Sequence, residues 1–271
     1  MLANRCLIVG VLNCTPDSFS DGGNVTSVKE AVEAGVRMAG EGADWIDVGG
    51  ESTRPGAQTV SGDEERARVV PVIEGLRSRL REDVLISIDT YKAETARVAL
   101  AAGARVVNDI SGALLDPAIL QVAAAAGAKI VLGHLRGRPS KMMDDVSFED
   151  VVREVGEELG PQLEAARAAG CREVWADPGI GFGKVLEHNL ALLRGLRGLG
   201  THLGAPLMVG VSRKSFIGHL TGKPAGERQF GTAAAVTAAV FGGAAAVRVH
   251  DVGAMRDVVR VAEALATPTG A

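Results

Sequence analysis

The stretch VLISIDTYKAETARVALAAGARVVND, residues 84–109, decides the fold. It opens with the apolar run VLISID (84–89) and closes with a second run, RVVND (105–109), and both have the composition of strands. Between them lies a helical stretch from Ala93 to Ala102, followed by Gly103 at the position where helices commonly end. A strand, a helix and a second strand in this order predict two parallel strands joined by a right-handed crossover.

The same unit repeats along the whole chain. The strand-like runs are almost continuously apolar, as strands covered on both faces should be. Eight of them occur, at LIVGVL (7–12), WIDVG (45–49), VLISID (84–89), RVVND (105–109), KIVLGH (129–134), EVWAD (173–177), LMVGV (207–211) and AVRVH (246–250). Helical stretches are predicted between and after them, over 28–40, 64–80, 93–102, 118–126, 148–169, 188–199, 227–241 and 252–266.

Eight strand–helix repeats within 271 residues predict an α/β fold of the (β/α)8 TIM barrel type. An open doubly wound sheet is the alternative, and the number of repeats disfavours it. No linker rich in proline or serine divides the chain, so a single domain is expected over residues 1–271.

Composition narrows the class of function. The net charge is −4, and lysine and arginine are spread along the chain, which argues against a nucleic-acid surface. The three cysteines form no CxxC pair, as is typical of a reducing compartment. The longest apolar-looking stretch, 230–247, is rich in alanine and interrupted by threonine and glycine, so it is a poor membrane span. A cytoplasmic protein that binds neither nucleic acid nor membrane is therefore expected.

Polar residues follow the end of every predicted strand, which is where barrels of this type carry their sites. They are Asn13, Asp47, Asp89, Asn108 with Asp109, His134, Asp177, Ser212 to Lys214, and Arg248 with His250. A single aspartate such as Asp89 is better explained as a helix cap than as a functional residue. The convergence of the whole set on one mouth favours a binding site, because Lys214, Arg248 and His250 are not capping residues.

The residue types suggest two subsites. Arg248 and His250 share a face of the last strand, and Asn13 lies on the neighbouring first strand once the barrel closes. Arginine and histidine together suit a phosphate group, and Asn13 with phosphate oxygens would suit Mg²⁺. Neither a GxSxG nor an HExxH motif is present, so a nucleophilic serine or a zinc site is not expected.

The second subsite comprises Asp89, Asn108 and Asp177, at the ends of the third, fourth and sixth strands. Carboxylates and an amide suit the edge of a planar heterocycle that carries both donors and acceptors. Lys214 could contact a carbonyl of the same ring.

Seven motifs, in order between Leu7 and Val252, resemble the dihydropteroate synthase family. They are GVLNCTPDSFSDGG (10–23), GADWIDVGGESTRPGA (42–57), SIDTYKAETA (87–96), VNDISG (107–112), DPGIGFGK (177–184), VGVSRKSFIG (209–218) and RVHDV (248–252). The resemblance implies a transferase of folate biosynthesis, a homodimer and a target of sulfonamides. Its reaction would join p-aminobenzoate to 6-hydroxymethyl-7,8-dihydropterin pyrophosphate, giving 7,8-dihydropteroate and pyrophosphate.

The resemblance also implies a role for individual residues. The pterin would be bound by Asp89, Asn108, Asp177 and Lys214, and the pyrophosphate by Asn13, Arg248 and His250, with Mg²⁺ on Asn13. Residues around p-aminobenzoate would be Phe19, Thr53, Arg54, Pro55, Phe182 and Ser215. Two mobile loops, at about 15–25 and 52–62, would close over the site. Pyrophosphate would leave before the amine attacks, and catalysis would rest on Asn13, Asp89, Lys214, Arg248 and His250.

The chain departs from the family pattern after the fifth strand. Gly133-His134-Leu135 stands where Met-His-Met is common, so a gap beside the pterin is expected at Gly133. Cys14, Trp45 and Trp175 also differ from the usual residues and are expected to serve packing.

Three other functions remain open at this stage. A pterin-binding barrel of a corrinoid methyltransferase would share the Asp/Asn/Asp set but lack Phe19 and the SRKSF segment. A barrel aldolase would use Lys214 as a Schiff-base lysine. A non-catalytic paralogue would bind a pterin without turnover.

Overall fold

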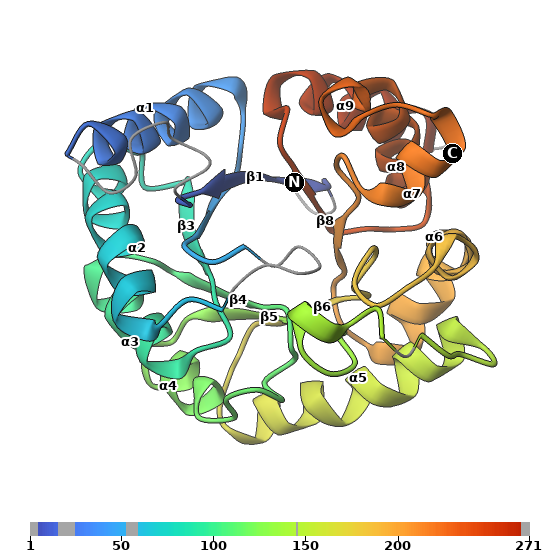
Figure 1. Cartoon of the computed structure of the whole chain (residues 1–271), viewed down its shortest axis with the longest axis horizontal. Coiled ribbons are helices and arrows are strands. Elements are labelled where there is room, and N and C mark those ends of the chain that lie inside the picture. Colours follow the sequence, from blue (N-terminus) through green and yellow to red (C-terminus); the bar gives the residue numbers. More distant parts are fainter. Residues whose placement is uncertain (1–4, 16–24, 53–58, 145, 267–271) are drawn as a thin grey trace, which may run out of the picture.

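The computed structural model describes residues 5–15, 25–52, 59–144 and 146–266. Within these ranges, eight parallel strands form one sheet in the order β6-β5-β4-β3-β2-β1-β8-β7. A bridge between Ala176 and Leu207 brings β6 beside β7 and closes the sheet. Helices surround the strands as an outer ring (Figure 1). The fold is the predicted single-domain TIM barrel.

The strands are β1 Leu7–Asn13, β2 Trp45–Gly49, β3 Leu85–Asp89, β4 Val106–Asp109, β5 Lys129–Gly133, β6 Val174–Asp177, β7 Met208–Gly210 and β8 Ala246–Val249. The α-helices are α1 Val25–Glu41, α2 Gly62–Arg77, α3 Ala93–Ala102, α4 Ile119–Ala125, α5 Val151–Ala168, α6 Leu186–Leu203, α7 Ser215–Thr221, α8 Gln229–Phe241 and α9 Val252–Ala266. Two short 3₁₀ helices, η2 Pro139–Lys141 and η3 Ala225–Glu227, lie in the connections.

Caps explain two departures of the helices from the predicted bounds. Helices α3 and α9 begin and end as predicted, and α7 was not predicted. Helix α5 begins later than expected because the Asp150 carboxylate accepts hydrogen bonds from the Val152 and Arg153 N–H groups. Helix α6 continues to Leu203 because Gly204 ends it in the left-handed conformation.

A cluster of apolar side chains, the apolar plug, fills the part of the barrel interior nearer the amino ends of the strands. Trp45 and Trp175 meet there edge to face, with their ring centroids 5.1 Å apart. Other members of this cluster are Val9, Val106, Val131, Met208 and Ala246, with Leu7 and Leu85 packed against them. The prediction that both tryptophans serve packing is confirmed. Cys14 is buried in the larger core between strands and helices, as was also predicted.

Side chains two residues apart on a strand point to the same side, so the plug determines what lies above it. Two residues beyond Trp45, Val106, Trp175 and Ala246 come Asp47, Asn108, Asp177 and Arg248. The apolar plug therefore supports a polar floor at the carboxyl ends of the strands.

A transmembrane helix must be both long and apolar. Among the described residues, no helix combines the length and the apolar character that a membrane span needs.

Candidate active site

Arg248 forms the centre of this floor. Its Nε donates to Asp47 Oδ2 at 2.6 Å, and its Nη2 donates to Asp89 Oδ2 at 2.7 Å. The Asn108 side-chain amide donates to the same Asp47 oxygen at 2.9 Å. Strands β2, β3, β4 and β8 are thus joined across the barrel by one network of four side chains.

The network has one cation for two buried carboxylates. Burial, with the charge of Asp47 beside it, raises the pKa of Asp89 to about 7 although Arg248 opposes the shift. Burial would lower the pKa of Arg248, but Asp47 and Asp89 more than offset it, so the guanidinium stays charged. Asp47 Oδ1 is buried and finds no hydrogen-bond partner among the residues that the structure describes. The free site therefore presents a buried carboxylate oxygen with room for a further hydrogen bond, which favours ligands that bring donors.

A pocket opens above the floor. It is lined by the predicted ring-binding residues Asp89, Asn108, Asp177 and Lys214, together with Ile110, Gly133, Gly179, Phe182, Gly210 and Arg248. The four predicted residues come from the ends of four different strands and meet at one place. The free cavity volume is about 20 Å³, and Arg248 lies across its floor between Asp47 and Asp89.

Asp177 and Lys214 form the charged wall of the pocket. Burial raises the pKa of Asp177, although the Gly179 N–H donates to its carboxylate at 2.8 Å and Lys214 lies nearby. Burial lowers the pKa of Lys214 to about 8, against the attraction of Asp177. The Lys214 Nζ lies 3.9 Å from the centre of the Phe182 ring, in a cation–π contact. The loop that follows β6 and the loop that follows β7 therefore meet where Phe182 contacts Lys214.

The gap expected at Gly133 is not found. A Cβ built on Gly133 would lie 2.8 Å from the Ile110 Cα and 2.9 Å from the Ile110 carbonyl oxygen. The backbone after β4 thus occupies the room that a methionine side chain would need, and Ile110 itself lines the pocket. The prediction of an open space was wrong, because it considered β5 without the neighbouring loop.

His250 and Asn13 lie on neighbouring strand ends, as predicted. Strand β1 pairs with β8 through Gly10 and Val249. The Ser212 Oγ accepts from the His250 backbone N–H at 3.2 Å and lies 3.0 Å from the His250 Nδ1. The hydroxyl can donate to Nδ1 when the ring proton is on Nε2, or accept from Nδ1–H in the other tautomer. Burial, with Arg248 and Arg213 nearby, lowers the pKa of His250 to about 4, so the free protein holds a neutral imidazole.

The other predicted contacts are placed only in part. Phe182 lines the pocket, and Ser215 is the exposed first residue of α7. Phe19, Thr53, Arg54 and Pro55 lie outside the described residues, as does most of the two predicted mobile loops.

Sequence analysis missed a charged cluster beside the site. The Lys92 ammonium binds Glu51 and lies 2.9 Å from Glu65 Oε2, which also accepts from Thr95 Oγ1 at 3.1 Å. This cluster ties the segment after β2 to helices α2 and α3. Glu65 shares its helix face with Val69, Val72 and Ile73. A lone carboxylate on that apolar face was the signal that could have identified it.

Fold and site together define a barrel enzyme that binds a pterin. Residues 9–250 match the family model described as "Pterin binding enzyme". The dihydropteroate synthase of Synechocystis is 49% identical over 264 residues, covering 96% of this chain and 90% of that protein. The chain belongs to the dihydropteroate synthase family, a family of transferases in folate biosynthesis.

Solved structures agree with this assignment. The dihydropteroate synthase of Xanthomonas albilineans with 4-aminobenzoic acid superposes with a TM-score of 0.90 at 43% identity, covering 98% of this chain and 95% of that chain. The Yersinia pestis enzyme in complex with a sulfonamide drug gives a TM-score of 0.89 at 41% identity, with 96% and 94% covered.

Proposed function

We propose that the chain joins 6-hydroxymethyl-7,8-dihydropterin pyrophosphate to p-aminobenzoate, and that its pterin lies in the pocket above Arg248. The observation that supports this place is the convergence of Asp89, Asn108, Asp177 and Lys214 on one small pocket. The test is release of pyrophosphate from the pterin substrate. Release should depend on p-aminobenzoate and be accompanied by an equal amount of dihydropteroate, whereas a non-catalytic paralogue would release neither.

Ring binding and the contacts of Arg248 compete for the same carboxylate, because the guanidinium spans Asp47 and Asp89 and Asp89 also lines the pocket. We propose that the entering pterin takes over Asp89, and that Arg248 turns toward the pyrophosphate attached to the same ligand. Asp177 would accept N–H bonds from the ring, Asn108 would both donate and accept, and the Lys214 ammonium would donate to the ring carbonyl.

The leaving group is assigned to Asn13, Arg248 and His250. Negative charge grows on the pyrophosphate oxygens as the C–O bond breaks, so cationic and N–H donors there favour the transition state over the ground state. In the tautomer that carries the ring proton on Nε2, His250 would donate to these oxygens, and a nearby pyrophosphate would raise the low pKa of this imidazole.

Asn13 fits a magnesium ion that shares its ligands with the substrate. It supplies one neutral oxygen at the end of β1. Elsewhere in the described part of the chain, no group of three or more His, Cys, Asp or Glu residues is arranged for a metal. Mg²⁺ commonly keeps few protein ligands and several phosphate or water oxygens. When bound, the ion would neutralise charge on the departing pyrophosphate.

We expect turnover and pyrophosphate affinity to require Mg²⁺, and binding of the bare pterin ring not to require it. The reason is that the ring residues hold no metal ligand, whereas pyrophosphate would supply most of the ion's shell. Calorimetry with pterin and with pyrophosphate, in EDTA and in Mg²⁺, separates the two. Full turnover in excess EDTA would contradict this assignment.

The p-aminobenzoate amine is neutral and needs no strong base. We propose that Phe182 forms one wall of its subsite, and that Phe19, Thr53, Arg54, Pro55 and Ser215 contribute the remainder. Support for Phe182 comes from its place beside Lys214 at the pocket. The assignment of the other residues rests on the motifs.

The Lys214 ammonium gives a prediction for pH. Burial and the nearby charge of Arg248 lower its pKa to about 8, against the attraction of Asp177 and Asp89. The amine is charged below pH 8 and neutral above it, so kcat/KM should fall as the pH rises through about 8, since kcat/KM reports the free enzyme. Lys214→Arg should have lower activity throughout but lose this alkaline decline, because arginine stays charged. A decline that persists in the arginine variant would assign it to another group.

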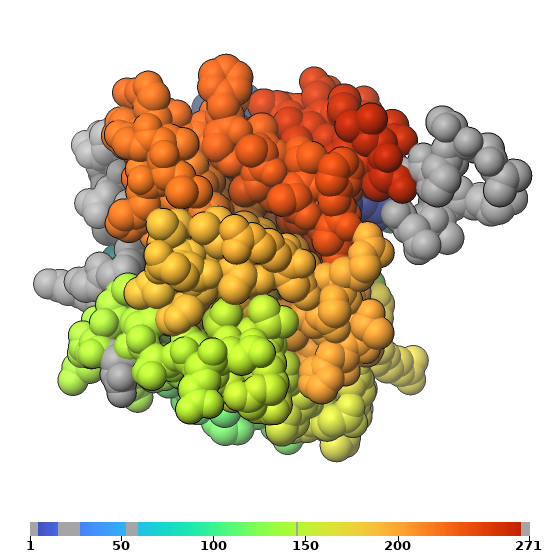
Figure 2. Space-filling model, turned by 90° about the vertical axis from the view of Figure 1, so that its right-hand side faces the viewer, coloured from blue at the N-terminus to red at the C-terminus, as the bar shows by residue number. Residues whose placement is uncertain are grey.

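A homodimer through α6, α7 and α8 is also proposed. An apolar groove of about 750 Å³ lies between these helices, lined by Leu190, Leu193, Phe216, Ile217, Ala235 and Phe241 among others. Figure 2 faces this side, with α6 in yellow-orange beneath the orange of α7 and α8. Leu220, at its edge, is 59% exposed, which a second copy would cover. A cytoplasmic location is proposed as well, supported by three unpaired, buried cysteines.

A further inference from the structure

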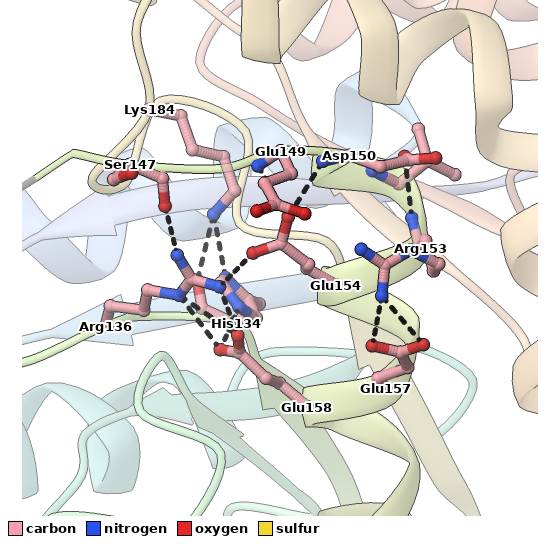
Figure 3. Close-up of polar contacts among 11 residues, drawn as sticks. His134, Arg136, Ser147, Glu149, Asp150, Arg153, Glu154, Glu157, Glu158 and Lys184 are labelled. Atoms are coloured by element: carbon pink, nitrogen blue, oxygen red, sulfur yellow. Dashed lines mark hydrogen bonds and ion pairs between the residues drawn. The ribbon is translucent and has the colours of Figure 1, made fainter.

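A third buried charged group, formed by Lys184, His134 and Glu158, lies behind the pocket, and the function proposed above does not use it. His134, just after β5, and Lys184, at the end of the DPGIGFGK segment, are 2% and 4% exposed. The Lys184 Nζ lies 2.9 Å from the His134 Nδ1, and the His134 Nε2 lies 3.0 Å from Glu158 Oε2 on α5. Figure 3 shows Lys184 pointing at His134, with Glu158 on its other side.

These contacts fix the proton on His134. The Lys184 ammonium can only donate, so Nδ1 must accept, and Nε2 must carry the hydrogen that Glu158 accepts. Burial and the neighbouring Lys184 lower the pKa of His134 to about 4, which agrees with a neutral ring. The three side chains form a directed chain of hydrogen bonds from Lys184 to Glu158.

Glu158 is fixed in turn by Arg136. The Arg136 Nε donates to both of its carboxylate oxygens, at 3.0 and 3.2 Å, and the Arg136 Nη2 donates to Glu154 at 2.8 Å. The guanidinium also lies over the Phe148 ring, 3.8 Å from its centre. The outer end of the chain is therefore fixed to helix α5.

The inner end holds the loop that carries Phe182. The Lys184 Nζ donates to the Phe182 carbonyl at 3.0 Å and lies 3.5 Å from the His134 carbonyl. Gly179 has a φ of +68°, and a Cβ there would lie 2.0 Å from the His134 carbonyl oxygen, so the loop packs directly on the end of β5. The Phe182 ring then meets Lys214 at the pocket.

Burying an ammonium group costs folding free energy, which a purely structural contact would not require. Burial lowers the pKa of Lys184 to about 7, and an apolar side chain at such a site is often at least as stable. The ammonium instead supplies directional hydrogen bonds. It donates to His134, just after β5, and to the Phe182 carbonyl in the loop that follows β6. Lys184 is not among the described residues that line the pocket, although Asp177 in that pocket attracts its charge.

We propose that Lys184 is a positioning residue, which with His134 and Glu158 sets the place of the Phe182 ring in the p-aminobenzoate subsite. This inference deepens the proposed function and rests on it, because it assumes that Phe182 faces the second substrate. Lys184 acts through the loop and does not touch the reacting atoms.

The test is steady-state kinetics of Lys184→Met, which keeps the length and the packing of the stem. The KM for p-aminobenzoate should rise about tenfold, with kcat within about threefold, because Phe182 provides contact that ground state and transition state share. Pterin affinity, measured by calorimetry, should stay within about twofold, because Asp177 and Asn108 are unchanged. Lys141→Met, in the exposed η2 segment, is the matched control and should behave as the wild type.

A double-mutant cycle separates positioning from general damage. In a Phe182→Ala background, Lys184→Met should raise the KM for p-aminobenzoate by less than about twofold, since the ring it positions is gone. A further tenfold rise there, or an unchanged KM in Lys184→Met alone, would overturn the inference.

Should Lys184→Met fail to fold, Glu158 offers a second test at the outer end of the chain. Glu158→Gln keeps an acceptor for the His134 Nε2–H and should leave the KM unchanged, whereas Glu158→Leu removes it and should raise the KM. Equal values for the two variants would overturn the inference. If the wild-type protein itself lacks p-aminobenzoate-dependent pyrophosphate release, the proposed function fails before any variant is compared.

Discussion

Asp177→Asn and Asn108→Ala are each expected to remove most of the pterin affinity while the barrel stays folded. Asp177 offers a carboxylate to ring N–H groups, and an asparagine would turn one of its donors toward them. Losing a charge-assisted pair and leaving a buried donor unmatched costs about 3 kcal/mol, more than a hundredfold in affinity. Asn108→Ala also frees Asp47 from its amide contact at 2.9 Å. Calorimetry with the pterin measures both effects.

The fold should survive because an asparagine at 177 can still accept the Gly179 N–H bond, which is 2.8 Å long in the wild type. Asp150→Asn is a charge-matched control, because asparagine caps α5 as well as aspartate does. It should bind pterin with unchanged affinity. Wild-type affinity in both Asp177→Asn and Asn108→Ala would exclude this pocket as the pterin site.

Arg248→Met is expected to lose both activity and stability. Asp47 and Asp89 would remain buried without their cation, and breaking a buried ion pair on one side typically costs about 3–5 kcal/mol. The pyrophosphate would also lose its arginine, which predicts a decrease in kcat/KM of about a hundredfold to a thousandfold. Denaturant unfolding and pyrophosphate release measure the two losses.

The triple variant Asp47→Asn, Asp89→Asn, Arg248→Met separates these effects. It leaves no charge in the network, so most of the lost stability should return, while activity should stay at or below that of Arg248→Met, because Asp89 also belongs to the ring site. Recovered activity in the triple variant would show that Arg248 serves only to neutralise the two aspartates.

The fold was predictable because each strand–helix unit carries its own signals. The apolar runs marked the strands, and the segment 93–102 marked helix α3 to the residue. Helix α7 was missed because its seven residues are too few to display a helical period. The departures at α5 and α6 came from caps at Asp150 and Gly204, which act at single residues within otherwise helical stretches.

The ring-binding set was also predictable, because polar residues at the ends of apolar strands must converge when parallel strands close into a barrel. The partners of those residues were not. Arg248 and Asp47 are 201 residues apart in sequence, and their contact depends on the closure of the barrel. The contact between Ile110 and Gly133 likewise arises between two loops, and no local pattern in either segment indicates it.

The two tryptophans give the molecule an optical property of its own. They are the only two in the chain, and both lie in the apolar plug, each two residues before an aspartate of the floor. The tryptophan fluorescence of the folded protein therefore originates at one location, directly beneath Asp47 and Asp177. Indole emission depends on nearby charges, so the exchange of partners that we propose for Arg248 should change it in the unlabelled wild-type protein.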